Sequence, residues 1–268
     1  MEPMTEIEST VELPTGKIRL LRAGAGEPLL VLHRDIGSPG WLPFYQELAG
    51  RFEVLVPDLP GYGNSERPDF ARHPRDIAII MQQFLDKLTI DRVALVGLGF
   101  GGWIAAEMAT MAQRRLSALV LVAPMGLLPE EGDIYDQMLA DHIEYVMEGF
   151  GTQDAYDRQF GAQPDPQTAY QWDLNKEMTA RIAWKPYMIS HQLPHLLRAV
   201  ETRTLLVWGQ QDKIVPLDAG RLNGNALPNA HLEILPDAGH SVEMESPVEL
   251  AKLVTGHVES ARRERGSR

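Results

Sequence analysis

The sequence predicts an α/β protein with a mostly parallel sheet wrapped by helices. Short, mostly apolar runs at residues 29–32, 93–98, 116–122 and 204–208 are typical of strands buried on both faces. These runs alternate with segments whose apolar residues have helical spacing, and that alternation favours a parallel sheet. A chain of 268 residues is long enough for one such domain with an insertion.

The elements follow in order from local patterns. Pro14-Thr15-Gly16 is a turn sequence between two short strands, at residues 11–13 and 17–22. The apolar run 29–32 ends at His33. The segment Phe52–Pro57 has strand composition, and the residues at 75–89 repeat apolar side chains with the period of a helix. The apolar runs at 93–98, 116–122 and 204–208 complete the expected sheet strands.

Residues 128–199 interrupt this alternation. They begin with an acidic stretch and continue with helical patterns rich in Met, Tyr and Trp, including Trp184. We interpret 128–199 as a helical cap inserted into a core formed by residues 1–127 and 200–268. A cap here would cover the carboxyl ends of the strands, where open α/β sheets bind ligands. Most cap aromatics are expected to pack between helices, and Trp184 is expected to contact substrate in an apolar pocket.

Composition excludes several classes of function. With 25 Lys and Arg against 37 Asp and Glu, the net charge of −12 disfavours binding to nucleic acid or to anionic membranes. The absence of cysteine excludes disulfides, thiol catalysis and thiolate metal sites. The acidic N-terminus lacks the features of a signal peptide, and no apolar run approaches the length of a membrane span, so a cytoplasmic location is expected.

A glycine-rich turn follows the run at 93–98. Gly97 ends the strand, Gly101 and Gly102 begin a stretch of small residues, and Gly99 lies between them. Four other segments carry candidate site residues. They are His33, the turn Asp58–Ser65, Gly209–Pro216 with Asp212, and Gly239-His240 followed by Glu245-Ser246-Pro247. Asp58 and Ser65 are expected to hold their turn, and Glu245 to cap or support the final helix.

In this order and at these intervals, the five segments resemble capped members of the α/β-hydrolase superfamily. The resemblance covers nearly the whole chain and implies the α/β-hydrolase fold, with a mostly parallel sheet of about eight strands. In that family the position of Gly99 carries a nucleophile, usually Ser. Glycine has no side-chain nucleophile, so the resemblance indicates the fold more strongly than the activity.

The resemblance implies that Asp212 and His240 form an acid–base pair. The carboxylate would hold one imidazole nitrogen and fix its tautomer, which leaves the other nitrogen to accept a proton. The alternative is a vestigial pair that is retained only by packing. We expect His240 to be functional, because both partners and both flanking motifs are present.

A second departure concerns the loop after His33. The family motif begins His-Gly, whereas this chain reads His33-Arg34-Asp35. By position, the backbone N–H groups of Asp35 and Phe100 would bind a developing oxyanion. His33 and Arg34 are expected to contact substrate, and Asp35 is a candidate second acid or base. The sequence leaves open whether the side chains of Arg34 and Asp35 face the pocket or the solvent.

Three hypotheses for function remain. In the first, His240 activates water or abstracts a proton directly, and the protein hydrolyses an ester, a lactone or a C–C bond of a small, moderately hydrophobic molecule. In the second, the capped pocket binds a small molecule without turnover, as a receptor does. In the third, an ordinary serine hydrolase has lost its nucleophile through a Ser-to-Gly substitution.

Metal and cofactor chemistry are not predicted. His191 and His195 are four residues apart, but Pro194 lies between them and no carboxylate clearly joins them. Both histidines are expected to be mostly exposed. The glycines at 97–102 do not have the spacing of a dinucleotide-binding loop, so no cofactor is expected.

Overall fold

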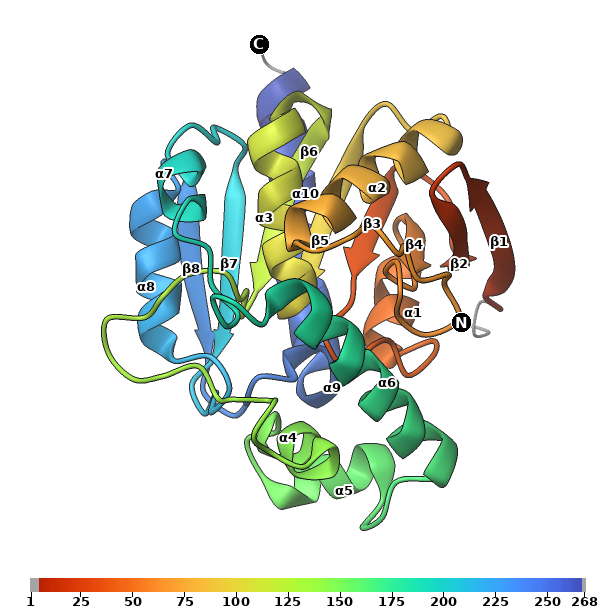
Figure 1. Ribbon diagram of the computed structural model, residues 1–268. Coiled ribbons are helices and arrows are strands. Elements are labelled where there is room, and N and C mark those ends of the chain that lie inside the picture. The colour runs from red at the N-terminus through yellow and green to blue at the C-terminus, as the bar shows by residue number, and fades with distance from the viewer. Residues whose placement is uncertain (1–4, 267–268) are drawn as a thin grey trace.

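Eight strands form one sheet in the order β1-β2-β4-β3-β5-β6-β7-β8 (Figure 1). The computed structural model describes residues 5–266. Strands β1 and β2 form an antiparallel hairpin, β2 pairs antiparallel with β4, and the remaining neighbours are parallel. The strands are β1 Ile7–Leu13, β2 Gly16–Ala23, β3 Pro28–Leu32, β4 Glu53–Pro57, β5 Val93–Leu98, β6 Leu116–Val122, β7 Thr204–Gly209 and β8 Ala230–Leu235. The predicted sheet of about eight mostly parallel strands is confirmed.

The helices lie on both faces of the sheet and beyond one of its ends. They are α1 Pro43–Ala49, α2 Pro74–Lys87, α3 Phe100–Ala112, η1 Gln113–Arg115 (a 3₁₀ helix), α4 His142–Glu148, α5 Gln153–Phe160, α6 Pro166–Ala183, α7 Leu193–Leu197, α8 Leu217–Ala226, α9 Val242–Glu245 and α10 Pro247–Gly266. Helices α2, α3 and α8 cover one face, and α1 and α10 cover the other (Figure 1).

The side-chain alternation of the strands divides the core into two layers. In β3, Leu30 and Leu32 pack with the helices of the α3 face, whereas Leu29 and Val31 pack with those of the α10 face. All four side chains are fully buried. Burial on both faces explains why the inner strands read as continuous apolar runs in the sequence.

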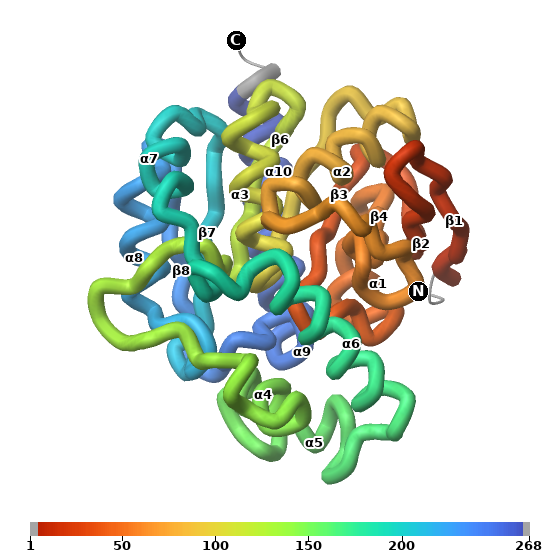
Figure 2. The backbone as a smooth tube through the Cα atoms, in the orientation of Figure 1, coloured from red at the N-terminus to blue at the C-terminus, as the bar shows by residue number. Residues whose placement is uncertain are grey.

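The segment 128–199 contains α4, α5, α6 and α7. Figures 1 and 2 show α4, α5 and α6 beyond the end of the sheet that also holds α9. Helix α4 packs against α6, whereas α7 packs against α3 and α8 in the helical layer. The interpretation of 128–199 as one cap stays a prediction. Within residues 5–266, no helix combines the length and apolar character needed to cross a bilayer.

The turn that follows β4 has the predicted structural role. The Asp58 carboxylate accepts a hydrogen bond from the Asn64 amide at 2.9 Å and pairs with Arg19. Ser65 Oγ donates to the Asp58 carbonyl at 2.7 Å. Glu245 does not cap the last helix. Its carboxylate accepts from the amides of Gly151 and Gly239 and so joins the segment after α4 to the loop that carries His240.

Candidate active site

Gly99 occupies the tight turn between β5 and α3, as the sequence predicts. Its φ of +51° lies in the region that favours glycine, because a side chain there is strained. The Gly99 amide donates to the Val122 carbonyl at 2.9 Å, which ties the turn to the end of β6. The close approach of the start of α3 to the end of β3 also requires glycine at position 101. A Cβ atom on Gly101 would lie 2.3 Å from the Leu32 carbonyl oxygen. The glycines therefore allow α3 to begin directly above the strand ends.

Asp212 and His240 lie in the loops after β7 and β8 and form a buried pair. His240 Nδ1 lies 2.9 Å from Asp212 Oδ2. The other carboxylate oxygen accepts from the amides of Ile214 and Val215, each at 2.9 Å, which fixes its orientation. With Nδ1–H donating to the carboxylate, Nε2 is left as a proton acceptor. Nε2 is buried and has no hydrogen-bond partner among residues 5–266.

The unpaired nitrogen of His240 faces Gly99. A Cβ atom on Gly99 would lie 3.0 Å from His240 Nε2 and also 3.0 Å from Arg34 Nη1. Arg34 Nη1 is likewise buried without a partner in the described part of the chain. One proton acceptor and one cationic donor therefore converge on the space above the Gly99 Cα. An oxygen atom placed in that space can donate to the imidazole and accept from the guanidinium.

A carboxylate that the sequence analysis missed holds Arg34 in place. Arg34 Nε and Nη2 donate to the two carboxylate oxygens of Glu243 in α9, at 2.7 and 2.6 Å. Both side chains are 2% exposed. Burial alone would lower the pKa of Arg34, but the charge and hydrogen bonds of Glu243 outweigh burial and raise it. Arg34 is thus a fixed buried cation. Its partner is 209 residues distant in sequence, and no local motif points to it.

Asp35 also turns inward. Its side chain is 0% exposed. Oδ2 accepts a hydrogen bond of 2.9 Å from Gln137 Nε2, and Gln137 belongs to the segment before α4. The structure therefore excludes the solvent-facing alternative that the sequence left open, because Arg34 and Asp35 are both buried. Sequence reasoning did not single out Gln137.

Comparison with known proteins identifies the family. The family model described as "Alpha/beta hydrolase family" matches residues 29–253, which include all of the site just described. The chain belongs to the alpha/beta hydrolase family. This confirms the family resemblance predicted from the ordered motifs.

Named relatives of this alpha/beta hydrolase are enzymes. The chain is 28% identical over 254 residues to 2-hydroxymuconate semialdehyde hydrolase of Pseudomonas sp. (strain CF600), with 87% of each chain covered. It is 26% identical over 254 residues to 2-hydroxy-6-oxo-6-phenylhexa-2,4-dienoate hydrolase of Burkholderia cepacia, with 85% of this chain and 86% of that one covered. A solved membrane phospholipase A shares the fold, with a TM-score of 0.83, 22% identity, and coverage of 96% and 87%.

Phe100 is placed as the sequence predicts, at the start of α3 and fully buried. Its N–H belongs to the first turn of the helix, where amides have no intrahelical acceptor. This amide is therefore available to an oxyanion beside Gly99. The ring of Phe100 packs against Tyr62 and Trp103.

The structure places two residues of the alpha/beta hydrolase that the sequence predicts to contact substrate. His33 uses both ring nitrogens on the backbone, since Nδ1 lies 2.6 Å from the Arg34 carbonyl and Nε2 accepts from the Leu59 amide at 2.8 Å. Its role is to position the loop of Arg34 and Asp35. Trp184 follows α6 and is 52% exposed, and its contact with substrate stays a prediction. His191 and His195 are exposed, as expected.

We expect the free energy of unfolding to fall as the pH is lowered through about 6.5, the ordinary pKa of histidine. Burial lowers the pKa of His33, so the folded protein keeps it neutral while the unfolded chain takes up a proton. The contribution of His33 to the free energy of unfolding is complete above the ordinary pKa of histidine. It is lost as the pH falls towards the lower pKa of His33 in the folded protein. Half-buried His257 shifts in the same direction.

Urea unfolding at a series of pH values measures this dependence. One proton gives a slope of at most ~1.4 kcal/mol per pH unit. His33→Asn should lower the slope of the unfolding free energy against pH by the part that comes from protonation of one histidine, whatever effect the substitution has on stability at neutral pH. An unchanged slope in that variant would contradict the assignment.

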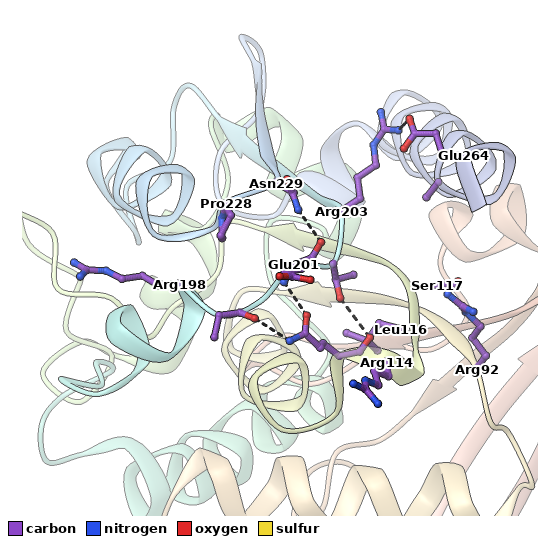
Figure 3. A pocket seen from close by; sticks show the side chains of 14 residues that line it. Arg92, Arg114, Leu116, Ser117, Arg198, Glu201, Arg203, Pro228, Asn229 and Glu264 are labelled. Carbon is purple, nitrogen blue, oxygen red and sulfur yellow. Dashed lines mark hydrogen bonds and ion pairs between the residues drawn. The ribbon is translucent and has the colours of Figure 1, made fainter. Parts of the chain in front are cut away.

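Two hollows of the hydrolase lie outside this site. The larger, of about 1020 Å³, lies near the amino ends of β6, β7 and β8 and carries four arginines (Figure 3). Its polar groups serve the fold, since Gln113 bonds to the backbone of Ala199 and Glu201, and Asn229 bonds to the Glu201 carbonyl. A smaller hollow of about 300 Å³ lies between residues 127–130 and helices α7 and α8. Neither is lined by Gly99, Arg34, Asp35 or His240. The predicted cavity shared by the site residues stays a prediction.

Proposed function

We propose that this alpha/beta hydrolase cleaves a small, moderately hydrophobic carbonyl compound with water that His240 activates, and without a covalent enzyme intermediate. The observation that carries the proposal is the buried, unpaired Nε2 of His240, which faces the space above Gly99 while Asp212 holds Nδ1. Asp212 fixes the tautomer and stabilises the imidazolium that forms. A general base of this kind contributes about 10²–10⁴-fold to rate.

The proposed reaction begins with a water molecule between His240 and the substrate carbonyl. The water gives a proton to Nε2, and its oxygen attacks the carbonyl carbon. Arg34 Nη1 and the N–H groups of Phe100 and Asp35 bind the oxyanion, and such donors are worth about 10²–10³-fold each. The imidazolium then returns the proton to the leaving group as its bond to the carbonyl carbon breaks. The products are a carboxylic acid and the protonated leaving group.

The relatives favour C–C bond hydrolysis among the reactions considered. The two curated relatives described above are named as hydrolases of 2-hydroxymuconate semialdehyde and of 2-hydroxy-6-oxo-6-phenylhexa-2,4-dienoate. In substrates of this kind the leaving carbon is stabilised by conjugation, so an activated water suffices as the nucleophile. We therefore propose a conjugated keto acid of this class as the substrate, with esters and lactones as further candidates.

Inhibition by a serine-directed phosphonate tests the absence of a covalent intermediate. We expect the protein to hydrolyse the phenyl-substituted dienoate after full exposure to the reagent, with an unchanged intact mass, because Gly99 offers no hydroxyl. An ordinary serine esterase serves as the reagent control. Loss of turnover together with a mass increase would show a nucleophilic serine elsewhere and would overturn the mechanism. No turnover of any dienoate, ester or lactone would overturn the enzyme proposal itself.

A further inference from the structure

Three buried polar side chains meet beside the proposed reaction centre, and their hydrogen-bonding capacity is not fully used. They come from different parts of the chain, namely Asp35 after β3, Gln137 before α4 and Tyr145 within α4. Asp35 Oδ1 and Gln137 Oε1 are buried and without a hydrogen-bond partner of normal geometry among residues 5–266, and the equally buried Tyr145 hydroxyl has only the Asp35 carboxylate beside it as a partner. Each such atom costs about 1–3 kcal/mol when nothing satisfies it.

Contacts show that these three side chains form one group. Gln137 Nε2 donates to Asp35 Oδ2 at 2.9 Å. Burial, and after it the negative charge of the nearby Asp35 carboxylate, raises the pKa of Tyr145 well above its ordinary value. Tyr145 therefore keeps its proton and lies close to the same carboxylate. Asp35 follows Arg34 in sequence, and its carboxylate is near enough to help raise the pKa of the Arg34 guanidinium, whose Nη1 faces Gly99.

The chemistry of the unused atoms defines what they can bind. An ionised carboxylate oxygen and an amide oxygen only accept hydrogen bonds, and a tyrosine hydroxyl either donates or accepts. The Asp35 and Gln137 oxygens are therefore satisfied by a ligand group that donates hydrogen bonds. Metal binding is not indicated, since no cluster of three or more His, Cys, Asp or Glu side chains suited to a metal ion occurs in the described part of the chain.

We propose that Asp35, Gln137 and Tyr145 form a recognition subsite for a hydroxyl or N–H group of the substrate, a few bonds from the reacting carbonyl. The inference rests on the proposed function only for the position of that carbonyl above Gly99. A ligand with an ether or a hydrogen atom in place of the donor leaves the acceptors unpaired and is rejected. Sites of this kind discriminate more strongly than apolar pockets do.

Binding of simple aryl ketones tests the subsite without turnover. The probes are the three hydroxyacetophenone isomers and their methyl ethers, with affinity measured by isothermal titration calorimetry on the full chain. We expect at least one hydroxy isomer to bind tenfold or more tightly than its ether. Asp35→Ala should reduce that ratio to threefold or less, whereas Asp133→Ala, an exposed carboxylate on the same segment as Gln137, should leave it unchanged.

Gln137→Met and Tyr145→Phe provide further variants if Asp35→Ala does not fold. Each should lower the affinity of the hydroxy isomer relative to its ether. Equal affinity of every hydroxy isomer and its ether would overturn the inference and would show that the subsite holds only water. The same binding measurement on His240→Ala, compared with turnover by the wild-type protein, separates this inference from the proposed function. If the preference for the hydroxy isomer over its ether is retained but the wild-type protein shows no turnover, the subsite stands and the proposed reaction is overturned. If turnover depends on His240 but no hydroxy isomer binds more tightly than its ether, the proposed reaction stands and the subsite is overturned.

Discussion

Replacing His240 with alanine should lower turnover of the favoured substrate at least about a hundredfold, because it removes the proposed general base, whose Nε2 faces Gly99. Asp212→Asn should also lower the rate, because an amide cannot stabilise the imidazolium and can select the wrong tautomer. Steady-state kinetics on the wild-type protein and both variants, at saturating substrate, compares their kcat values.

The control for this experiment is His191→Ala, which removes an exposed histidine remote from the pair and should leave turnover unchanged. Circular dichroism confirms that each variant is folded. Turnover of the wild-type protein that survives in His240→Ala would contradict general-base catalysis by this residue. No turnover by either protein, with tight binding of a small hydrophobic ligand, would instead support a receptor that uses the same site.

Replacing Arg34 with alanine should lower the free energy of unfolding by about 3–5 kcal/mol, because it leaves the Glu243 carboxylate buried without its partner. Replacing both residues, in Arg34→Met/Glu243→Leu, should recover most of that loss, since an apolar pair of similar volume removes both buried charges. Urea unfolding of the wild type, Arg34→Met, Glu243→Leu and the double variant gives the coupling energy.

The recovered double variant should nevertheless remain poorly active, because it lacks the donor above Gly99. Arg67→Ala is the matched control, since Arg67 pairs with Glu177 at the surface and its loss should change stability little. Full activity in a stable Arg34→Met/Glu243→Leu protein would show that Arg34 serves the fold alone. A single variant as stable as the wild type would contradict the buried ion pair.

The strand and helix pattern was largely predictable because it depends on local periodicity. Residues 29–32 and 93–98 are fully apolar because both of their faces are covered by helices. Gly99 could be placed at a strand-to-helix turn from its glycine neighbours alone. Asp212 and His240 could be paired because their two segments resemble those that carry the acid and the histidine in the α/β-hydrolase superfamily.

The sequence by itself thus determined the class of fold, the position of Gly99 and the pairing of Asp212 with His240. Tertiary structure alone decided that Arg34 turns inward to Glu243, that Asp35 meets Gln137, and that Trp184 faces the solvent. The physical reason is the range of the interactions. Periodicity reports which face of an element is buried, whereas a bond between residues 102 or 209 positions apart depends on how distant elements pack.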